Sequence, residues 1–264
     1  MNILITLCGR SGSKGVKNKN YRNFLGIPLV HYSIAAAKIF IDYNPLHSVD
    51  ICINSDSNEL LTIATKFDGI TGIIRPIELA WDTSPKIPVI RYSLNYMEQY
   101  KNKQYDYVID LDITSPLRKA EDICSAFEKA HAMHVDAVLS VTHSRRNPYF
   151  NMLEYVNGTL KKVINSNFNA RQQAPTVYDV NASIYCYSRK ALLENLKNSP
   201  LDGTFDIIIM KDTAVLDIDS EEDFILMEVL AKYFFENEYK NIYEYVLKLQ
   251  NEIFTENHLY GENI

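Results

Sequence analysis

The 264-residue chain lacks several features that would place it in a specialised class of protein. No apolar run approaches the ~20 residues that cross a bilayer, and the N-terminal apolar run is too short for a signal peptide. The four cysteines are scattered without a C-x-x-C pair, which argues against a disulfide framework or a zinc site. The formal net charge of -6 argues against general nucleic-acid binding. The composition predicts a cytoplasmic protein, and its 47% hydrophobic content is enough for a large core.

Acidic residues are absent from residues 10–22, where five basic side chains occur. This stretch contains Gly12 and Gly15, and it follows Ile3–Leu7, an apolar run typical of a strand. Glycines let backbone N–H groups approach a ligand closely, and hydrogen bonds to charged groups contribute about 1.5–3 kcal/mol each. The glycine spacing fits neither the P-loop nor the dinucleotide-binding fingerprint. We interpret the stretch as a polyphosphate-binding loop, with a flexible basic surface loop as the alternative; its candidate ligands are Arg10, Ser11, Gly12, Ser13 and Lys14.

Apolar periodicity predicts strands alternating with helices through the first half of the chain, which is typical of a three-layer α/β sheet. Strands are expected at Ile3–Leu7, Asp50–Asn54, Gly72–Ile74, Tyr105–Leu111 and Val135–Val141. The helices between them are expected at Pro28–Phe40, Asn58–Phe67, Ile87–Tyr100 and Glu121–His134, and two more at 220–235 and 241–254. Asn157-Gly158, among aromatic and β-branched residues, predicts a hairpin that leaves the sheet.

Two pairs of aspartates have the spacing Asp-x-Asp. Asp110 and Asp112 stand at the carboxyl end of an expected strand, where open parallel sheets bind ligands; a capped turn is the alternative for Asp110. Asp217 and Asp219 follow a β-branched run that we interpret as a strand, so both carboxylates would share one face and reach one Mg²⁺ ion. The motif is weak by itself, because it also marks many glycosyltransferases. Asp223 is interpreted as a first-turn helix charge.

Several motifs, taken as a set, resemble those of the CMP-sialic acid synthetases, the cytidylyltransferases that activate nonulosonic acids. They are G-R-S-G-S-K-G with Lys19-Asn20, R-P-I-E-L-A-W-D-T, T-S-P-L-R, R-Q-Q-A-P, Y-D-V-N-A-S-I-Y and D-I-D. The resemblance spans residues 1–232 and implies a Rossmann-like nucleotidyltransferase fold that uses CTP and Mg²⁺, or Mn²⁺. It also implies an arm, at about 145–180, that pairs two subunits in a homodimer. We therefore expect a cytidylyltransferase domain at 1–235 and a helical extension at 236–264.

The same resemblance implies a role for each matching residue. Arg10 and Lys14 would neutralise the departing pyrophosphate, Lys19 and Asn20 would position the nucleotide, and Arg75 would contact cytosine or ribose. Asp217 and Asp219 would hold the metal, and Asp217 is also a candidate catalytic residue. The expected sugar-binding residues are Asp112, Thr114, Ser115, Arg171, Gln172, Asp179 and Asn181. Arg171 is the candidate for the sugar's carboxylate, because a guanidinium binds that group bidentately. Trp81 stands where the family pattern varies and is assigned to packing, and His31 is assigned to packing or capping and not to catalysis.

Two departures from the family pattern concern the acceptor sugar. Asp112 stands where Gln is common, so it either touches the sugar or helps to hold a metal. Asp179 stands where the sialic acid enzymes have Arg, which favours a different sugar tail and the legionaminic acid branch. Three other functions remain open: a glycosyltransferase with a D-x-D metal site, a sugar-1-phosphate nucleotidylyltransferase, whose G-x-G-x-R…P-K loop is missing, and a non-catalytic CTP-sensing module.

Overall fold

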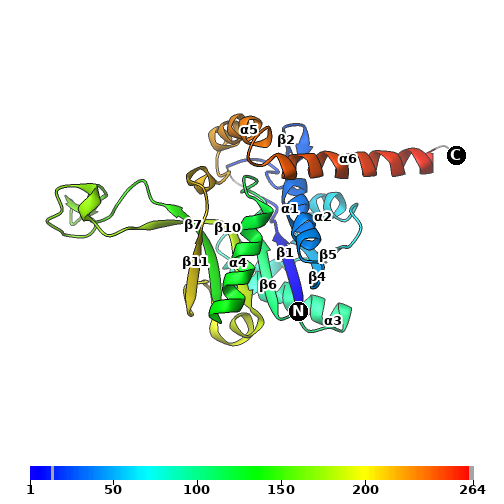
Figure 1. The fold of residues 1–264 in the computed structure, drawn as a ribbon, viewed down its shortest axis with the longest axis horizontal. Coiled ribbons are helices and arrows are strands. Elements are labelled where there is room, and N and C mark those ends of the chain that lie inside the picture. The colour runs from blue at the N-terminus through cyan, green and yellow to red at the C-terminus, as the bar shows by residue number, and fades with distance from the viewer. Residues whose placement is uncertain (13–14, 262–264) are drawn as a thin grey trace.

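A seven-stranded sheet runs through the middle of the protein, in the strand order β11-β7-β10-β6-β1-β4-β5 (Figure 1). The computed structural model describes residues 1–12 and 15–261. Neighbouring strands are parallel except around β10, which is antiparallel to β6 and β7. The strands are β1 (Asn2–Cys8), β4 (Ser48–Ser55), β5 (Ile70–Ile74), β6 (Tyr107–Leu111), β7 (Ala137–His143), β10 (Tyr178–Ser188) and β11 (Phe205–Ile209).

Helices cover both faces of this sheet, so the predicted three-layer α/β architecture is confirmed. Because successive strand side chains point to opposite faces, Ile3 and Ile5 of β1 join one hydrophobic core and Leu4 joins the other. The first core lies under α1 (Val30–Tyr43), α2 (Asn58–Ala64) and α4 (Ala120–Met133). The second lies under α3 (Lys86–Lys101) and the η3 turn (Ala191–Asn195).

The expected helix at Pro28–Phe40 begins two residues later than predicted. Ile27–Pro28 forms β3, which pairs with β2 (Asn23–Phe24) in a small hairpin, and α1 then starts at Val30. Leu25 and Gly26 in the turn both have positive φ angles, of 50° and 84°. The hairpin closes the loop that follows β1.

The last two helices pack against the α1 side of the sheet. α5 (Glu221–Phe235) begins with a capping box between Ser220 and Asp223, which confirms Asp223 as a helix-start charge. α6 (Lys240–Gly261) packs on α1 and α5 and then extends past the body (Figure 1). His31 is buried, with Nδ1 2.5 Å from Gln250 Nε2, which confirms a packing role. No helix in the described part of the chain is long and apolar enough to cross a membrane.

The strand predicted just before Asp217 is wrong. Asp212–Val215 forms a 3-10 turn, η4, and the residues after it are irregular. The edge position of the sheet is taken instead by β11, which was not predicted and whose apolar run pairs in parallel with β7. Ile218 still anchors the irregular segment, because its side chain is fully buried and its N–H donates to the carbonyl of Thr114 at 3.4 Å.

Residues 144–177 leave the sheet between β7 and β10 and project away from it (Figure 1). This arm carries β8 (Leu153–Val156), β9 (Thr159–Lys162) and the η2 turn (Arg171–Gln173). The predicted hairpin at Asn157-Gly158 is confirmed, with the positive φ angles of 52° and 77° that a tight primed turn requires. The part that the arm plays in pairing subunits stays a prediction.

Candidate active site

A cavity of about 500 Å³ opens at the carboxyl ends of β1 and β6. Its walls come from the loop after β1, the segment between β5 and α3, the end of β6 and the irregular segment before α5. These four regions are distant in sequence, and parallel strands bring their ends to one edge of the sheet. Of the predicted site residues, the cavity gathers Arg10, Lys19, Asn20, Arg75, Asp112, Thr114, Asp217 and Asp219.

The loop after β1 is held by carboxylates on its two sides. Arg10 forms an ion pair with Asp82 from the β5–α3 segment. The backbone N–H of Ser11 donates to Asp56 Oδ1 at 2.7 Å, and the hydroxyl of Ser11 donates to the other oxygen. Burial acts to raise the pKa of Asp56, but the hydrogen bonds from Ser11 outweigh it and hold the pKa below its usual range. Ser11 and Gly12 line an adjacent hollow of about 250 Å³ instead of the main cavity. Ser13 and Lys14 lie outside the described residues.

The far end of the same loop holds the Asp217–Asp219 segment in place. Lys19 Nζ donates to the carbonyl of Ile218 at 2.7 Å and lies 3.1 Å from Asp219 Oδ1. A Cβ atom on Gly15 would lie 1.7 Å from the carbonyl oxygen of Asp219, so only glycine fits there. The amide of Asn20 donates to the carbonyl of Arg10 at 3.0 Å and closes the loop on itself. The loop and the acidic segment therefore form one wall.

Arg75 lies deep in the cavity with a fixed side chain. It is 7% exposed, and its Nε and Nη2 donate to the side-chain and backbone oxygens of Asn54 at 2.7 and 2.9 Å. Asn54 is fixed in turn by Ser93 Oγ at 2.9 Å. A planar guanidinium with its position set in advance binds a flat polar group at low entropic cost.

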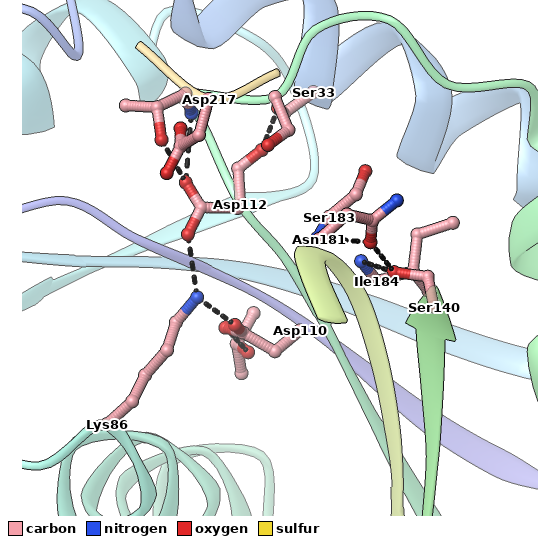
Figure 2. A network of polar contacts seen from close by, with 12 residues as sticks. Ser33, Lys86, Asp110, Asp112, Ser140, Asn181, Ser183, Ile184 and Asp217 are labelled. Carbon is pink, nitrogen blue, oxygen red and sulfur yellow. Dashed lines mark hydrogen bonds and ion pairs between the residues drawn. The ribbon is translucent and has the colours of Figure 1, made fainter. Parts of the chain in front are cut away.

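At the floor of the cavity one ammonium group joins two carboxylates, Asp112, which lines the cavity, and Asp110, which does not (Figure 2). Lys86 Nζ lies 2.8 Å from Asp110 Oδ2 and 2.9 Å from Asp112 Oδ2. The hydroxyl of Thr6 donates to the fully buried Asp110 at 2.7 Å, and Thr114 donates to Asp112 from its backbone N–H and its hydroxyl, at 2.9 and 2.7 Å. Asp110 is thus a buried ion-pair partner and not the cap of a turn.

The charges on this floor shift each other's pKa values. Burial alone would raise the pKa of Asp112, but the charge of Lys86 and the hydrogen bonds from Lys86 and Thr114 hold it well below its usual range. Burial alone would lower the pKa of Lys86, and the two aspartates raise it instead. No motif in the sequence pointed to Lys86. Two neighbouring buried carboxylates require a cation nearby, but not a particular one.

Asp217 completes the acidic side of the cavity and lies beside Asp112 (Figure 2). Burial raises the pKa of Asp217 above its usual range, and the negative charge of Asp112 adds to the rise. Asp219, two residues on, has a side chain that is 78% exposed. The two aspartates flank the buried Ile218 and line the same cavity, although no strand carries them.

The acidic side of the cavity fits a divalent cation. The carboxylates of Asp112, Asp217 and Asp219 line this side together, and their negative charges attract a cation. Within residues 1–12 and 15–261, no cluster of three or more His, Cys, Asp or Glu side chains is arranged to hold a metal. Mg²⁺ usually needs only one or two carboxylates and takes its other ligands from phosphate and water. Asp217, with Asp219 or Asp112, can supply that number.

A buried arginine holds the backbone that carries Asp112. Arg118 is 1% exposed, and it donates to the backbone carbonyls of Asp112 and Ser115. Burial lowers its pKa to about 10, against the opposing pull of Asp112 and Asp110. Ser115 is buried against Arg118 and is not part of the cavity lining, so the structure does not bring this predicted sugar contact to the cavity.

The other predicted sugar-binding residues lie away from the main cavity. Arg171 and Gln172 line a separate hollow of about 600 Å³ at the base of the arm, where Arg171 donates to the carbonyl of Ser144 at 2.6 Å. Asp179 pairs with Thr142 of β7. Asn181 is buried at the irregular part of β10 and accepts from Ser140 Oγ at 2.6 Å (Figure 2). Their roles toward a sugar stay predictions.

The structure places Trp81 differently from the packing role that we expected for it. Its side chain is 66% exposed and lines the main cavity, so the expected packing role is wrong. The expectation rested on the position of Trp81 at a place where the family pattern varies, which says nothing about whether its side chain is buried.

A family model described as cytidylyltransferase matches residues 5–260. The chain belongs to the cytidylyltransferase family. It is 42% identical to "Post-translational flagellin modification protein B" of Campylobacter coli over 87% of this chain and 95% of that protein. It is 38% identical to CMP-N,N'-diacetyllegionaminic acid synthase of Campylobacter jejuni over 86% of this chain and 94% of that protein. This cytidylyltransferase is therefore an enzyme of the nucleotidyltransferase class, as predicted.

Solved structures confirm the nucleotidyltransferase fold. A CMP:2-keto-3-deoxy-manno-octonic acid synthetase solved with CTP superposes with a TM-score of 0.63 at 12% identity, covering 88% of this chain and 99% of that one. A 4-diphosphocytidyl-2C-methyl-D-erythritol synthase of Anaerococcus prevotii gives 0.59 at 13% identity, covering 87% and 96%.

Proposed function

We propose that this cytidylyltransferase joins CTP to a nonulosonic acid and releases the CMP-sugar and pyrophosphate. The observation that carries the proposal is a single cavity that is lined by the cations Arg10, Lys19 and Arg75 and by the carboxylates of Asp112, Asp217 and Asp219. The cations suit a nucleoside triphosphate. The carboxylates suit a metal and the hydroxyl that attacks the phosphate.

The acceptor that we propose is a legionaminic-type acid. The relative named as a diacetyllegionaminic acid synthase is 38% identical to this chain, whereas an N-acylneuraminate cytidylyltransferase of Streptococcus agalactiae and a pseudaminic acid cytidylyltransferase of C. jejuni are 27% and 26% identical. Asp179 supports the same choice, because it replaces a cation of the sialic acid enzymes with an anion. Asp112 would then either face the sugar or share the metal.

The reaction would be an in-line displacement at the α-phosphorus of CTP. The anomeric hydroxyl of the sugar forms the new O–P bond, its proton passes to a carboxylate or to water, and the bond to the β-phosphate breaks with pyrophosphate leaving. Such transfers depend mostly on positioning and on electrostatic stabilisation. Arg10 would leave Asp82 to bind the departing phosphates, together with Lys14. Arg75 and Asn20 would hold the nucleoside end, and Lys19 would keep Asp217 beside the α-phosphate.

A divalent cation, Mg²⁺ or Mn²⁺, would be held by Asp217 with Asp219 or Asp112. When bound, it would neutralise phosphate charge and polarise the attacking hydroxyl. The gathering of these three carboxylates at one cavity supports this proposal.

The remaining sugar contacts would come from a homodimer. Arg171 and Gln172 are distant from the main cavity of their own chain, so we propose that the arm carries them to the cavity of a second copy. The 1–235 domain would carry the chemistry, and the helical extension beyond it would pack on α1 and α5. We also propose a cytoplasmic location, which the four free cysteines support.

The test is pyrophosphate release from CTP and Mg²⁺ with a panel of nonulosonic acids. We expect release with a legionaminic-type acid and little with N-acetylneuraminic acid. Equal rates with both would keep the reaction and remove the specificity assigned to Asp179. No release with any acid would favour a glycosyltransferase or a CTP-sensing module, neither of which the family and the relatives favour.

A further inference from the structure

The only tryptophan of the chain is placed unusually for its type. Trp81 is 66% exposed and lines the main cavity. It belongs to neither hydrophobic core, and none of the aromatic ring pairs among the described residues includes it. Large aromatic side chains are usually well buried, so the exposure of this indole is unusual.

Exposure alone would not be informative, because single apolar side chains are common on protein surfaces. Ile77, four residues earlier in the same segment, is 75% exposed and does not line the cavity. What distinguishes Trp81 is its place over the cavity. Ile77 therefore serves as a matched control for any experiment on Trp81.

The neighbours of Trp81 indicate which part of the cavity it covers. Its segment leaves β5 at the buried Arg75 and crosses to the loop after β1 through the ion pair between Asp82 and Arg10. Both arginines stand on the nucleotide side of the proposed function. The carboxylates proposed for the acceptor and the metal come from β6 and from the segment before α5.

The backbone of this segment is held mainly by local turns. The N–H of Leu79 donates to Pro76, that of Ala80 to Ile77 and that of Ser84 to Trp81, at 3.0–3.1 Å. The segment is anchored at one end by Arg75 and at the other by α3. The indole is thus carried at a fixed place beside the cavity, with its surface still open to a ligand.

We propose that Trp81 covers the nucleoside part of bound CTP, with the face of its indole against the pyrimidine or the ribose. The inference rests on the proposed use of CTP. It adds a residue that binds the nucleoside, a role that the cations proposed for the phosphates do not fill. Arg10 and Lys19 provide charge for phosphates, whereas a base needs a flat apolar surface. Aromatic stacking provides that surface without selecting strongly among bases.

Fluorescence provides a direct test, because all indole emission comes from this one residue. CTP and CMP, each added without acceptor, should change the intensity or the wavelength of the emission. Pyrophosphate alone should leave the emission unchanged, because it occupies only the phosphate positions. A response to pyrophosphate equal to that to CTP, or a response to the sugar acid with none to CTP, would overturn the proposal.

Binding measurements on variants provide a second, independent test. Trp81→Ala should raise the Kd for CTP about tenfold, equivalent to about 1.4 kcal/mol, while Trp81→Phe should keep most of the affinity. Ile77→Ala should bind CTP as the parent protein does. An unchanged Kd in Trp81→Ala would overturn the proposal. Failure of the proposed function would look different, because the parent protein would then release no pyrophosphate with any sugar acid.

Discussion

Two Asp-x-Asp pairs lie at the same cavity, which Asp112, Asp217 and Asp219 line while Asp110 is fully buried, and the two pairs are held in different ways. Asp110 and Asp112 end a buried strand and share the ammonium group of Lys86, and the pKa of Asp112 is held low. Asp217 and Asp219 lie on an irregular segment, and the pKa of Asp217 is raised. Identical spacing in the sequence thus produces one pair that shares an ammonium group and one pair in which Asp217, whose pKa is raised by burial and by the charge of Asp112, lies two residues from the exposed Asp219. We infer that the second pair is the one prepared for a cation.

The largest expected effect is the loss of turnover when Asp217 is replaced. Asp217→Asn keeps the shape and removes the charge, and we expect kcat to fall by about a thousandfold or more, equivalent to about 4 kcal/mol of transition-state stabilisation. Pyrophosphate release at saturating Mg²⁺ measures this, with circular dichroism as the control for folding. Near-normal turnover would remove Asp217 from the mechanism.

Asp110 and Asp112, the pair that Lys86 neutralises, should affect stability instead of turnover. Lys86→Met leaves two buried carboxylates without their cation, and we expect a loss of about 2 kcal/mol in the free energy of unfolding. This is less than for a fully buried pair, because the Lys86 side chain is 32% exposed. Urea unfolding measures the loss. The double variant Lys86→Met with Asp110→Asn should recover part of it, and a Lys86→Met protein as stable as the parent would contradict the account.

Asp219 should matter less than Asp217, because it is exposed and already paired with Lys19. We expect Asp219→Asn to lower kcat/KM about tenfold at limiting Mg²⁺, with partial recovery at higher Mg²⁺. A titration of activity against Mg²⁺ measures both. A loss as large as that of Asp217→Asn, with no recovery, would show that the two carboxylates act as one unit.

The smallest expected effect is a pH dependence of the contribution that Lys86 makes to the free energy of unfolding. The pKa of Asp112 is lower in the folded protein than its unfolded value of about 3.9. Its stabilisation is therefore present above that pH and is lost as the pH falls toward the folded pKa. The difference in the free energy of unfolding between the parent and Lys86→Met should narrow by on the order of 1 kcal/mol as the pH falls from about 5 to about 3. A gap that stays constant over that range would contradict the pairing.

Much of the framework could be predicted from local sequence. Apolar runs marked the main-sheet strands β1, β4, β5, β6 and β7, but not the short β2 and β3, and glycines with cations marked the loop after β1. The edge strand was misassigned because 205–209 and 214–218 are both β-branched runs a few residues apart, and only pairing with β7 selects the first. The start of α1 was misplaced because Pro28 also suits a strand end.

Contacts between distant residues could not be predicted. Lys86 meets Asp110 and Asp112 from another element, and no spacing in the sequence shows that pairing. Asp56 holds Ser11 from the turn between β4 and α2, and no motif in the sequence indicated that contact. The separation of Arg171 from the main cavity depends on where the arm points, which sequence does not encode locally.

The most direct test of the central claim is phosphorus NMR of a reaction containing CTP, Mg²⁺ and a legionaminic-type acid. The account predicts that the signals of CTP disappear while a phosphodiester and pyrophosphate appear in equal amounts, and that neither forms without the acid. Unchanged CTP, or free CMP in place of the phosphodiester, would contradict it.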